Sequence, residues 1–330
     1  MNLVTEYLGL VLRNPLIAGA SPLASNLDYA RRLEDAGIAA ITMHSLFEEQ
    51  IQLETRAQAM HVEAFEESFG EALSYLPQDY EFEFTPQKYL DHIAALKRAV
   101  EVPVIASLNG VTPGGWVEYA SLIESAGADA LELNYYDLPS DPLQSANDVE
   151  ERALEILGAV RKSIKIPIAV KLSPFFTSLP HFAQRLIDSG ANGIVLFNRF
   201  YQPDINIEDL EVQPVLNLSD SDELNLRLRW LAILSARLKT SFAVTGGVHT
   251  ATDVIKSIMA GASAVQIVSA LLKNGPQHVT KLLAEAGDWL DQHDYRSIGQ
   301  ICGSMSLANS PDPTAYERAN YMRILQSWKI

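Results

Sequence analysis

The sequence lacks several features that would each have pointed to a definite function. Its 330 residues include one cysteine, Cys302, which excludes an internal disulfide and any zinc or iron–sulfur site built from several cysteines. No apolar run approaches the ~20 residues that cross a bilayer. There is no G-x-G-x-x-G fingerprint for a dinucleotide. The first residues form neither a basic region nor an apolar signal core, so we expect a cytoplasmic protein with no membrane contact.

Positive charge is also scarce. Lys and Arg number 25 against 41 Asp and Glu, which gives a formal net charge of −16. Such a chain repels phosphate backbones, so we expect no nucleic-acid partner. A bound phosphate would have to be held locally, by backbone N–H groups or a well-placed lysine. The 48% hydrophobic content is typical of a globular protein with a substantial core.

Apolar segments alternate with amphipathic ones along the whole chain. Half of the apolar segments follow a loop, usually with a proline at its end, and half follow a glycine that ends a helix, such as Gly37 or Gly261. They are apolar throughout, as in a parallel sheet covered on both faces. The predicted strands lie within residues 14–20, 36–42, 102–107, 126–133, 166–171, 189–196, 240–245 and 260–267.

Segments with apolar residues at three- and four-residue spacing fill the gaps between these strands. The predicted helices are residues 27–36, 87–100, 117–126, 149–163, 181–188, 224–238, 250–260 and 277–290. Eight alternations of strand and helix predict a (β/α)₈ TIM barrel. No linker divides the chain, so we predict one domain over residues 1–330.

Three additions to a minimal barrel are predicted. Residues 3–12 read as a β-hairpin around Gly9 that closes the bottom of the barrel. An acidic and aromatic insertion over 47–85 follows the second strand, and a long acidic loop over 198–222 follows the sixth. Both fall on the rim where TIM-barrel sites lie, where long loops form lids or partner surfaces, although solvated decoration is an alternative.

A glycine pair after the seventh strand indicates a phosphate site. The segment Thr245-Gly246-Gly247-Val248 joins an apolar strand to a helix, and glycine lets backbone N–H groups approach an anion. In TIM barrels the loops after strands seven and eight commonly bind phosphate. A tight turn without any ligand is the alternative for this motif alone.

At this point the sequence resembles the FMN-dependent dihydroorotate dehydrogenases, and in particular their soluble class 1 branch. The resemblance runs unevenly over nearly the whole chain. Its motifs are Asn14-Pro15-Leu16-Ile17-Ala18-Gly19-Ala20-Ser21, Leu131-Glu132-Leu133-Asn134, Ala169-Val170-Lys171-Leu172-Ser173-Pro174-Phe175, Asn198, Thr245-Gly246-Gly247-Val248, Gly261-Ala262-Ser263 and Ala270-Leu271-Leu272-Lys273-Asn274-Gly275-Pro276. Several of them are weak alone, but their order on these strands is specific.

The resemblance implies a set of roles around FMN. Gly19, Ala20 and Ser21 would run against the isoalloxazine ring, with Asn134 and Lys171 beside it. Gly246, Gly247, Val268 and Ser269 would hold the phosphate, and Asn134 and Asn198 would bind a small-molecule substrate. Lys171 also stands out physically, because it ends an apolar strand and a buried ammonium needs an anionic partner, which we expect to be the flavin.

The match fails on the substrate chemistry. Where the family has Asn-x-x-Cys-Pro-Asn with Cys as base, this chain reads Asn134-Tyr135-Tyr136-Asp137-Leu138-Pro139, which makes Asp137 the predicted base. A buried Asp needs a raised pKa for that role, and Tyr136 and His44 are alternatives. Met43 is predicted at the family's strand-two lysine beside the flavin. No cluster of His and carboxylates indicates a metal.

The sequence therefore predicts an oxidoreductase that resembles dihydroorotate dehydrogenase. Retained activity would oxidise dihydroorotate to orotate, a step of pyrimidine biosynthesis, with Asp137 and Lys171 as catalytic residues. The alternatives are a flavin enzyme for another small molecule, a non-catalytic FMN- or phosphate-binding partner subunit and, more remotely, a phosphate-sugar barrel without flavin. The resemblance also implies a homodimer, and an electron-acceptor protein is a possible further partner.

Overall fold

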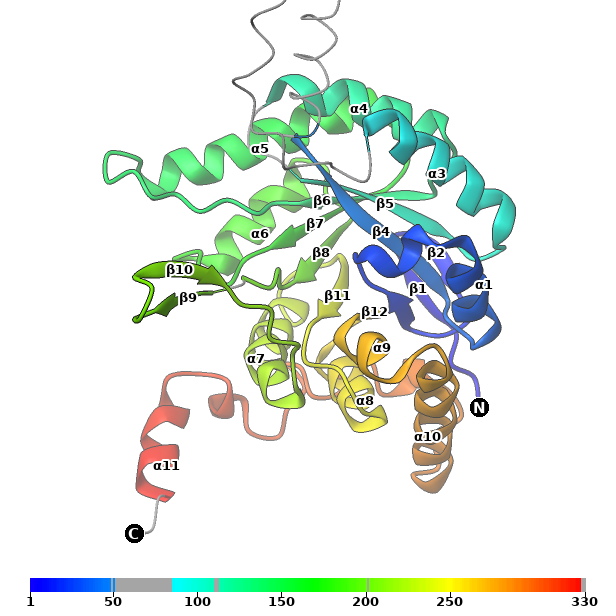
Figure 1. Cartoon of the computed structure of the whole chain (residues 1–330). Helices are drawn as coiled ribbons and strands as arrows, with labels where there is room; N and C mark the ends of the chain where they lie inside the picture. Colours follow the sequence, from blue (N-terminus) through cyan, green and yellow to red (C-terminus); the bar gives the residue numbers. More distant parts are fainter. Residues whose placement is uncertain (49, 51–84, 110–112, 201, 328–330) are drawn as a thin grey trace, which may run out of the picture.

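The computed structural model describes the chain except residues 49, 51–84, 110–112, 201 and 328–330, so most of the 47–85 insertion lies outside the described residues. Eight parallel strands form a closed barrel surrounded by helices (Figure 1). In order around the barrel they are β11 (Ser241–Thr245), β12 (Ala264–Ile267), β3 (Leu16–Ala18), β4 (Ala40–Phe47), β5 (Val104–Asn109), β6 (Ala130–Asn134), β7 (Ile168–Leu172) and β8 (Gly193–Leu196). The predicted TIM barrel is confirmed.

The helices lie where the apolar spacing predicts them, with ends shifted by a few residues. They are α1 (Leu27–Asp35), α3 (Pro86–Ala99), α4 (Pro113–Ser125), α5 (Ala146–Ser163), α6 (Leu179–Asp188), α7 (Leu224–Ser235), α8 (Ala251–Ala260) and α10 (Gln277–Gln292). Gly37, Gly127, Gly190 and Gly261 all have φ between +98° and +116°, as expected for glycines that end helices. The sequence analysis missed α9 (Ser269–Asn274), a short helix directly after β12.

Inside the barrel, an apolar layer lies below a polar one. Each strand alternates its side chains between the helices and the interior, so residues two apart along a strand stack in successive layers. Ala130 of β6 belongs to the lower apolar cluster, whereas Glu132 lies one step higher and Asn134 lines the cavity at the rim. Ala169 and Lys171 follow the same rule on β7. This alternation is what delivers polar groups to the upper end of the barrel.

The N-terminal hairpin closes the lower end of the barrel. Strands β1 (Thr5–Tyr7) and β2 (Leu10–Leu12) pair antiparallel around Gly9, as predicted. Tyr7, Leu8 and Leu12 are buried and pack against the lower apolar layer of the barrel strands. Leu8 sits directly against Gly193, where an added Cβ would approach its side chain to 2.6 Å. The hairpin therefore fills the space left by the small residues at this end.

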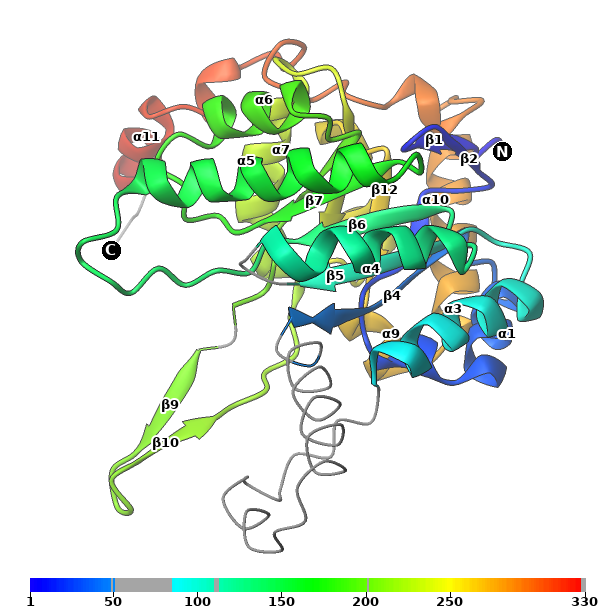
Figure 2. The ribbon, with the colours of Figure 1, turned by 90° about the horizontal axis from the view of Figure 1, so that it is seen from above.

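The segment from 198 to 222 is an excursion from the rim rather than an unstructured loop. It contains a second antiparallel hairpin, β9 (Pro203–Asn206) and β10 (Glu211–Pro214), and ends in a single 3₁₀ turn, Ser221–Glu223. Figure 2 shows this hairpin projecting away from the barrel. Ser219, near the end of the excursion, returns to the barrel and is almost fully buried.

After α10 the chain runs as turns to a last helix, α11 (Ala319–Ser327), at the edge of the molecule (Figure 1). Cys302, in these turns, is exposed. Within the described part of the chain, no helix is both long enough and apolar enough to span a bilayer.

Leu12 and Val11 give a matched test of the hairpin. Leu12 is 1% exposed and Val11 is 75% exposed on the same strand. We expect Leu12→Ala to lower the free energy of unfolding by about 2–5 kcal/mol, because it leaves a cavity in the packed lower end. Val11→Ala should change it by less than about 0.5 kcal/mol. Urea unfolding of both variants tests this, and equal effects would show that the hairpin does not seal the barrel.

Candidate functional site

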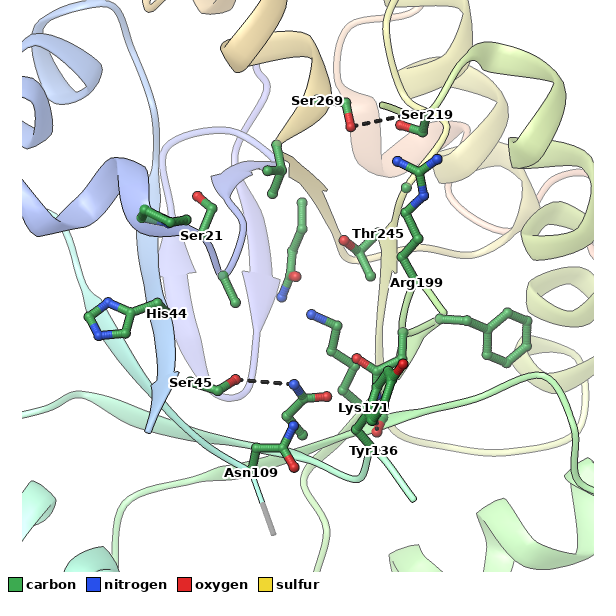
Figure 3. A pocket seen from close by; sticks show the side chains of 18 of the residues that line it. Ser21, His44, Ser45, Asn109, Tyr136, Lys171, Arg199, Ser219, Thr245 and Ser269 are labelled. Atoms are coloured by element: carbon green, nitrogen blue, oxygen red, sulfur yellow. Dashed lines mark hydrogen bonds between the residues drawn. The ribbon is translucent and has the colours of Figure 1, made fainter. Parts of the chain in front are cut away.

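A cavity of about 620 Å³ opens at the carboxyl ends of the barrel strands. This is the end at which TIM-barrel enzymes carry their active sites. We call it the main cavity, and Figure 3 shows part of its lining. It is lined by Ala20, Ser21, Pro22, Ser25, His44, Ser45, Phe47, Gln50, Asn109, Asn134, Tyr136, Lys171, Phe197, Asn198, Arg199, Ser219, Thr245, Gly246, Gly247, Val248, Gln266, Ile267, Val268 and Ser269.

Its floor is a buried ion pair with a third partner. Lys171 Nζ on β7 lies 3.2 Å from Glu132 Oε1 on the neighbouring strand β6. Gln266 on β12 donates from Nε2 to the other carboxylate oxygen of Glu132, at 2.6 Å. Glu132 is fully buried, and Lys171 and Gln266 are nearly so. Both oxygens of Glu132 are satisfied, which is what a buried carboxylate needs.

This arrangement corrects the expectation for Lys171. The sequence analysis assigned its anionic partner to the flavin alone, whereas the structure supplies Glu132 from within the barrel. The signal was present in the sequence, because Glu132 stands within an otherwise apolar buried strand. Gln266 was missed in the same way on β12. The lysine therefore brings its charge to the main cavity already balanced by a carboxylate.

The glycine turn forms one end of the main cavity, which we call the glycine end. Gly246 and Gly247 have φ of +86° and +83°, a conformation that side chains disfavour. A Cβ on Gly247 would lie 2.5 Å from the backbone nitrogen of Leu224. Arg227 of α7 is packed behind the turn and donates from Nε to the Thr245 carbonyl at 2.6 Å. Only glycine fits at these two positions. Because glycine has no side chain, the backbone of the turn itself borders the main cavity.

Ser219 fastens the end of the excursion to the glycine end. Gly247 N donates to Ser219 Oγ at 3.4 Å, and Ser219 N donates to Ser269 Oγ at 3.2 Å. Lys273 Nζ donates to the Ser219 carbonyl at 2.8 Å. Arg199, at the start of the excursion, extends toward Ser219 in Figure 3 and pairs with Glu223 at 3.1 Å. The sequence analysis named neither Ser219 nor Arg199.

Amides and hydroxyls form the opposite end, which we call the amide end: Ser45, Asn109, Asn134 and Asn198. Asn134 Nδ2 donates to Ser45 Oγ at 3.1 Å, and this hydroxyl meets Ser107 Oγ at 2.8 Å. Asn198 Nδ2 lies within hydrogen-bond distance of the Tyr135 and Lys171 carbonyls, at 3.3 and 3.4 Å. Figure 3 shows Ser45 and Asn109 on the far side of Lys171 from Ser219 and Ser269.

A register shift in β4 decides which residue of this strand meets the main cavity. The pairing with β5 is irregular between Thr42 and Ser45. As a result Met43 is buried in the outer core, and His44 and Ser45 both line the main cavity. The expectation that Met43 takes the flavin-facing place is therefore wrong. Burial lowers the pKa of His44 to about 4, with His92 adding to the effect, so His44 is uncharged at neutral pH.

The segment after β6 alternates its side chains between two cavities. Asn134 and Tyr136 line the main cavity, whereas Tyr135 and Asp137 line a second cavity of about 270 Å³. Asp137 pairs there with Arg152 at 3.1 Å. Tyr136 stacks on Phe200, with ring centroids 4.3 Å apart. An extended chain points every second side chain the same way, so a base counted three residues after Asn134 falls on the opposite face.

Most of the predicted site residues come together. Those that line the main cavity are Ala20, Ser21, Asn134, Lys171, Asn198, Gly246, Gly247, Val268 and Ser269. Gly19 lies behind the lining, where an added Cβ would approach the Val268 side chain to 2.8 Å. Asp137 is the one predicted catalytic residue that the structure separates from this group. Its placement speaks against a role as the base.

Two buried oxygens indicate what the main cavity can hold. Within the described part of the chain, Asn134 Oδ1 and Gln266 Oε1 have no hydrogen-bond partner, although their residues line the main cavity. A buried acceptor without a partner costs free energy until a ligand supplies a donor. A flavin ring carries one N–H, between two carbonyls, which can satisfy one of these acceptors and leaves the other for a second ring, and FMN adds a phosphate that suits a glycine turn. The residues present therefore fit FMN.

The site and fold define a TIM barrel with a polar, ligand-sized cavity and a glycine turn at its rim. Comparison with known proteins is consistent with this. A sequence model of the dihydroorotate dehydrogenase family matches residues 85–290. The chain thus belongs to the dihydroorotate dehydrogenase family, whose members are flavin oxidoreductases that bind FMN.

Individual relatives are distant. A putative dihydroorotate dehydrogenase A (fumarate) from Aeropyrum pernix is 28% identical over 225 residues, which cover 64% of this chain and 70% of the relative. The catalytic subunit of dihydroorotate dehydrogenase B (NAD⁺) from Anoxybacillus flavithermus is 26% identical over 91% of this chain and 95% of its own. A chloroplastic dihydropyrimidine dehydrogenase (NADP⁺) from Arabidopsis thaliana is 24% identical over 89% and 75%.

The buried floor predicts a marked stability effect. Glu132→Ala leaves the Lys171 ammonium without its carboxylate, so we expect the free energy of unfolding to fall by about 3–5 kcal/mol. The double variant Glu132→Ala with Lys171→Met removes both charges and should be the more stable of the two. Denaturant unfolding of the ligand-free proteins measures both. If the double variant is no more stable than the single one, the ion pair does not govern this floor.

Proposed function

We propose that the protein binds FMN in the main cavity and transfers a hydride between this cofactor and a dihydropyrimidine-type ring. The observation that carries the proposal is the continuity of one cavity from the glycine end, past Lys171, to the amide end. Its volume of about 620 Å³ is within the range of small-molecule sites. Family membership supports the same reaction class.

Different residues of the chain would bind different chemical groups of the cofactor. Backbone N–H groups of the turn, the Ser269 hydroxyl and the Arg199 guanidinium would hold a phosphate at the glycine end. Gln266 Oε1 would accept a hydrogen bond from a ring N–H. Lys171 would bring a balanced positive charge to the middle of the cavity. Phe197 would wall the site against water.

When bound, FMN supplies the hydride acceptor or donor. The protein has to hold the substrate ring at the amide end and move one proton at the neighbouring carbon. Tyr136 is the better supported group for this proton, because its side chain lines the main cavity, whereas Asp137 pairs with Arg152 outside it. Positioning and proton transfer are the two contributions required of the chain.

Oxidation of dihydroorotate to orotate, predicted from the resemblance, is one reaction of this type. The names of two relatives refer to these ring types, one to dihydroorotate and the other to dihydropyrimidine. A homodimer, an electron-acceptor protein and a cytoplasmic location also stay predictions. Light scattering over a wide concentration range tests the homodimer.

Titration with FMN tests the proposed cofactor. We expect saturable binding with quenching of flavin fluorescence. Lys171→Ala should weaken binding or lower the reduction potential of the bound flavin, because a positive charge near the ring is lost. Lys165→Ala, which removes an exposed lysine, is the matched control and should change neither. A protein that takes up no FMN would refute the flavin assignment.

A pair of variants separates the two proposed proton-transfer groups. Tyr136→Phe keeps the ring stacked on Phe200 and removes the hydroxyl, so we expect anaerobic flavin bleaching by substrate to slow by about 10²–10⁴-fold. Asp137→Asn should leave the rate within about twofold, since its carboxylate faces Arg152. The opposite result, with only Asp137→Asn slowed, would restore Asp137 as the base.

A further inference from the structure

The two described basic side chains that line the main cavity, Lys171 and Arg199, are each paired with a carboxylate. Among the described lining residues, Lys171 and Arg199 carry a full positive charge, and none carries a carboxylate. Lys171 is paired with Glu132 at the floor. Arg199 is paired with Glu223 and extends toward Ser219, at the glycine end. His44 faces the main cavity as an uncharged imidazole.

The hydrogen-bonding groups of the amide end are arranged as acceptors toward a ligand. Asn134 donates through Nδ2 to Ser45, and its Oδ1 is buried with no partner among the residues that the structure describes. Asn198 has its Nδ2 at two backbone carbonyls, so its Oδ1 is the amide atom left for a ligand. Carbonyl oxygens attract ring N–H groups, and they repel a carboxylate, which can only accept.

We propose that the amide end selects an uncharged cyclic amide, a dihydropyrimidine ring without a carboxylate substituent. The ring N–H groups would bind Asn134 Oδ1 and Asn198 Oδ1, and Ser45 fixes the first of these amides. A ring carboxylate would be buried beside these oxygens, while the two described cations of the cavity are already balanced by Glu132 and Glu223, which is unfavourable. The inference rests on the proposed function and goes beyond it by naming the substrate class.

The redox step balances with the bound cofactor as the oxidant. Oxidation of 5,6-dihydrouracil removes a hydride from one ring carbon and a proton from its neighbour, and a C=C bond forms to give uracil. When bound, FMN would accept this hydride with its two electrons, and a group of the site would take the proton. Dihydroorotate undergoes the same change, so the two substrates differ by a carboxylate and not by mechanism.

The experiment compares the two ring types on the FMN-loaded protein. Binding of uracil and of orotate is followed by flavin difference spectra, and anaerobic bleaching is followed with 5,6-dihydrouracil and dihydroorotate. We expect uracil to bind at least about tenfold more tightly than orotate, and dihydrouracil to bleach the flavin faster. Equal or tighter binding of orotate, or binding of neither ring to the FMN-loaded protein, would overturn the inference. Failure to take up FMN at all would instead refute the proposed function.

A gain-of-charge variant tests the cause of the selectivity. Asn109→Lys places an ammonium at the amide end and should raise the affinity for orotate relative to uracil by about tenfold or more. Leu143→Lys adds the same charge at a position that is 90% exposed and outside the main cavity, so it should leave the ratio unchanged. FMN uptake by each variant confirms that it is folded. An unchanged ratio in Asn109→Lys would show that missing charge is not what excludes the carboxylate.

Discussion

The contact between Lys171 and Glu132 is the constraint on which the rest of the site depends. A lysine inside a barrel is tolerable only with a carboxylate beside it, and that carboxylate needs its second oxygen satisfied, which Gln266 does. Three strands are thereby tied across the barrel at one height. The layer below them is apolar and sealed by the hairpin, and the layer above them opens to ligands. The floor therefore separates the apolar lower layer, which stabilises the barrel, from the main cavity, which is open to ligands.

The two ends of the main cavity are built by different means. At the glycine end the backbone forms the binding surface, because Gly246 and Gly247 are held in a turn that admits no side chain. At the amide end side chains form the binding surface, and their orientation is set by Ser45 and by backbone carbonyls. A phosphate suits the first end because backbone N–H groups bind any anion. A ring with defined donors suits the second, because amides discriminate among ligands.

The fold could be predicted almost entirely from the sequence, because apolar strands and helix-ending glycines such as Gly261 are local signals. The order of the motifs predicted residues that do line the main cavity, such as Lys171. Side-chain direction could not be predicted where one residue of offset reverses it. The irregular pairing of β4 buries Met43 and exposes His44 to the main cavity, and the alternation after β6 sends Asp137 to a second cavity. Such offsets depend on contacts with neighbouring strands, which no local pattern records.

The sealed lower end has a consequence for the order in which ligands bind and dissociate. With Tyr7, Leu8 and Leu12 filling the bottom of the barrel, the rim is the way in for everything that reaches the floor. Cofactor and substrate would then share one entrance, and whichever occupies the deeper position has to arrive first and depart last. A flavin seated over Lys171 would thus stay through many turnovers while the smaller ring exchanges above it. Kinetically, the protein would behave as a holoenzyme with a resident cofactor, not as one that trades its flavin in each cycle.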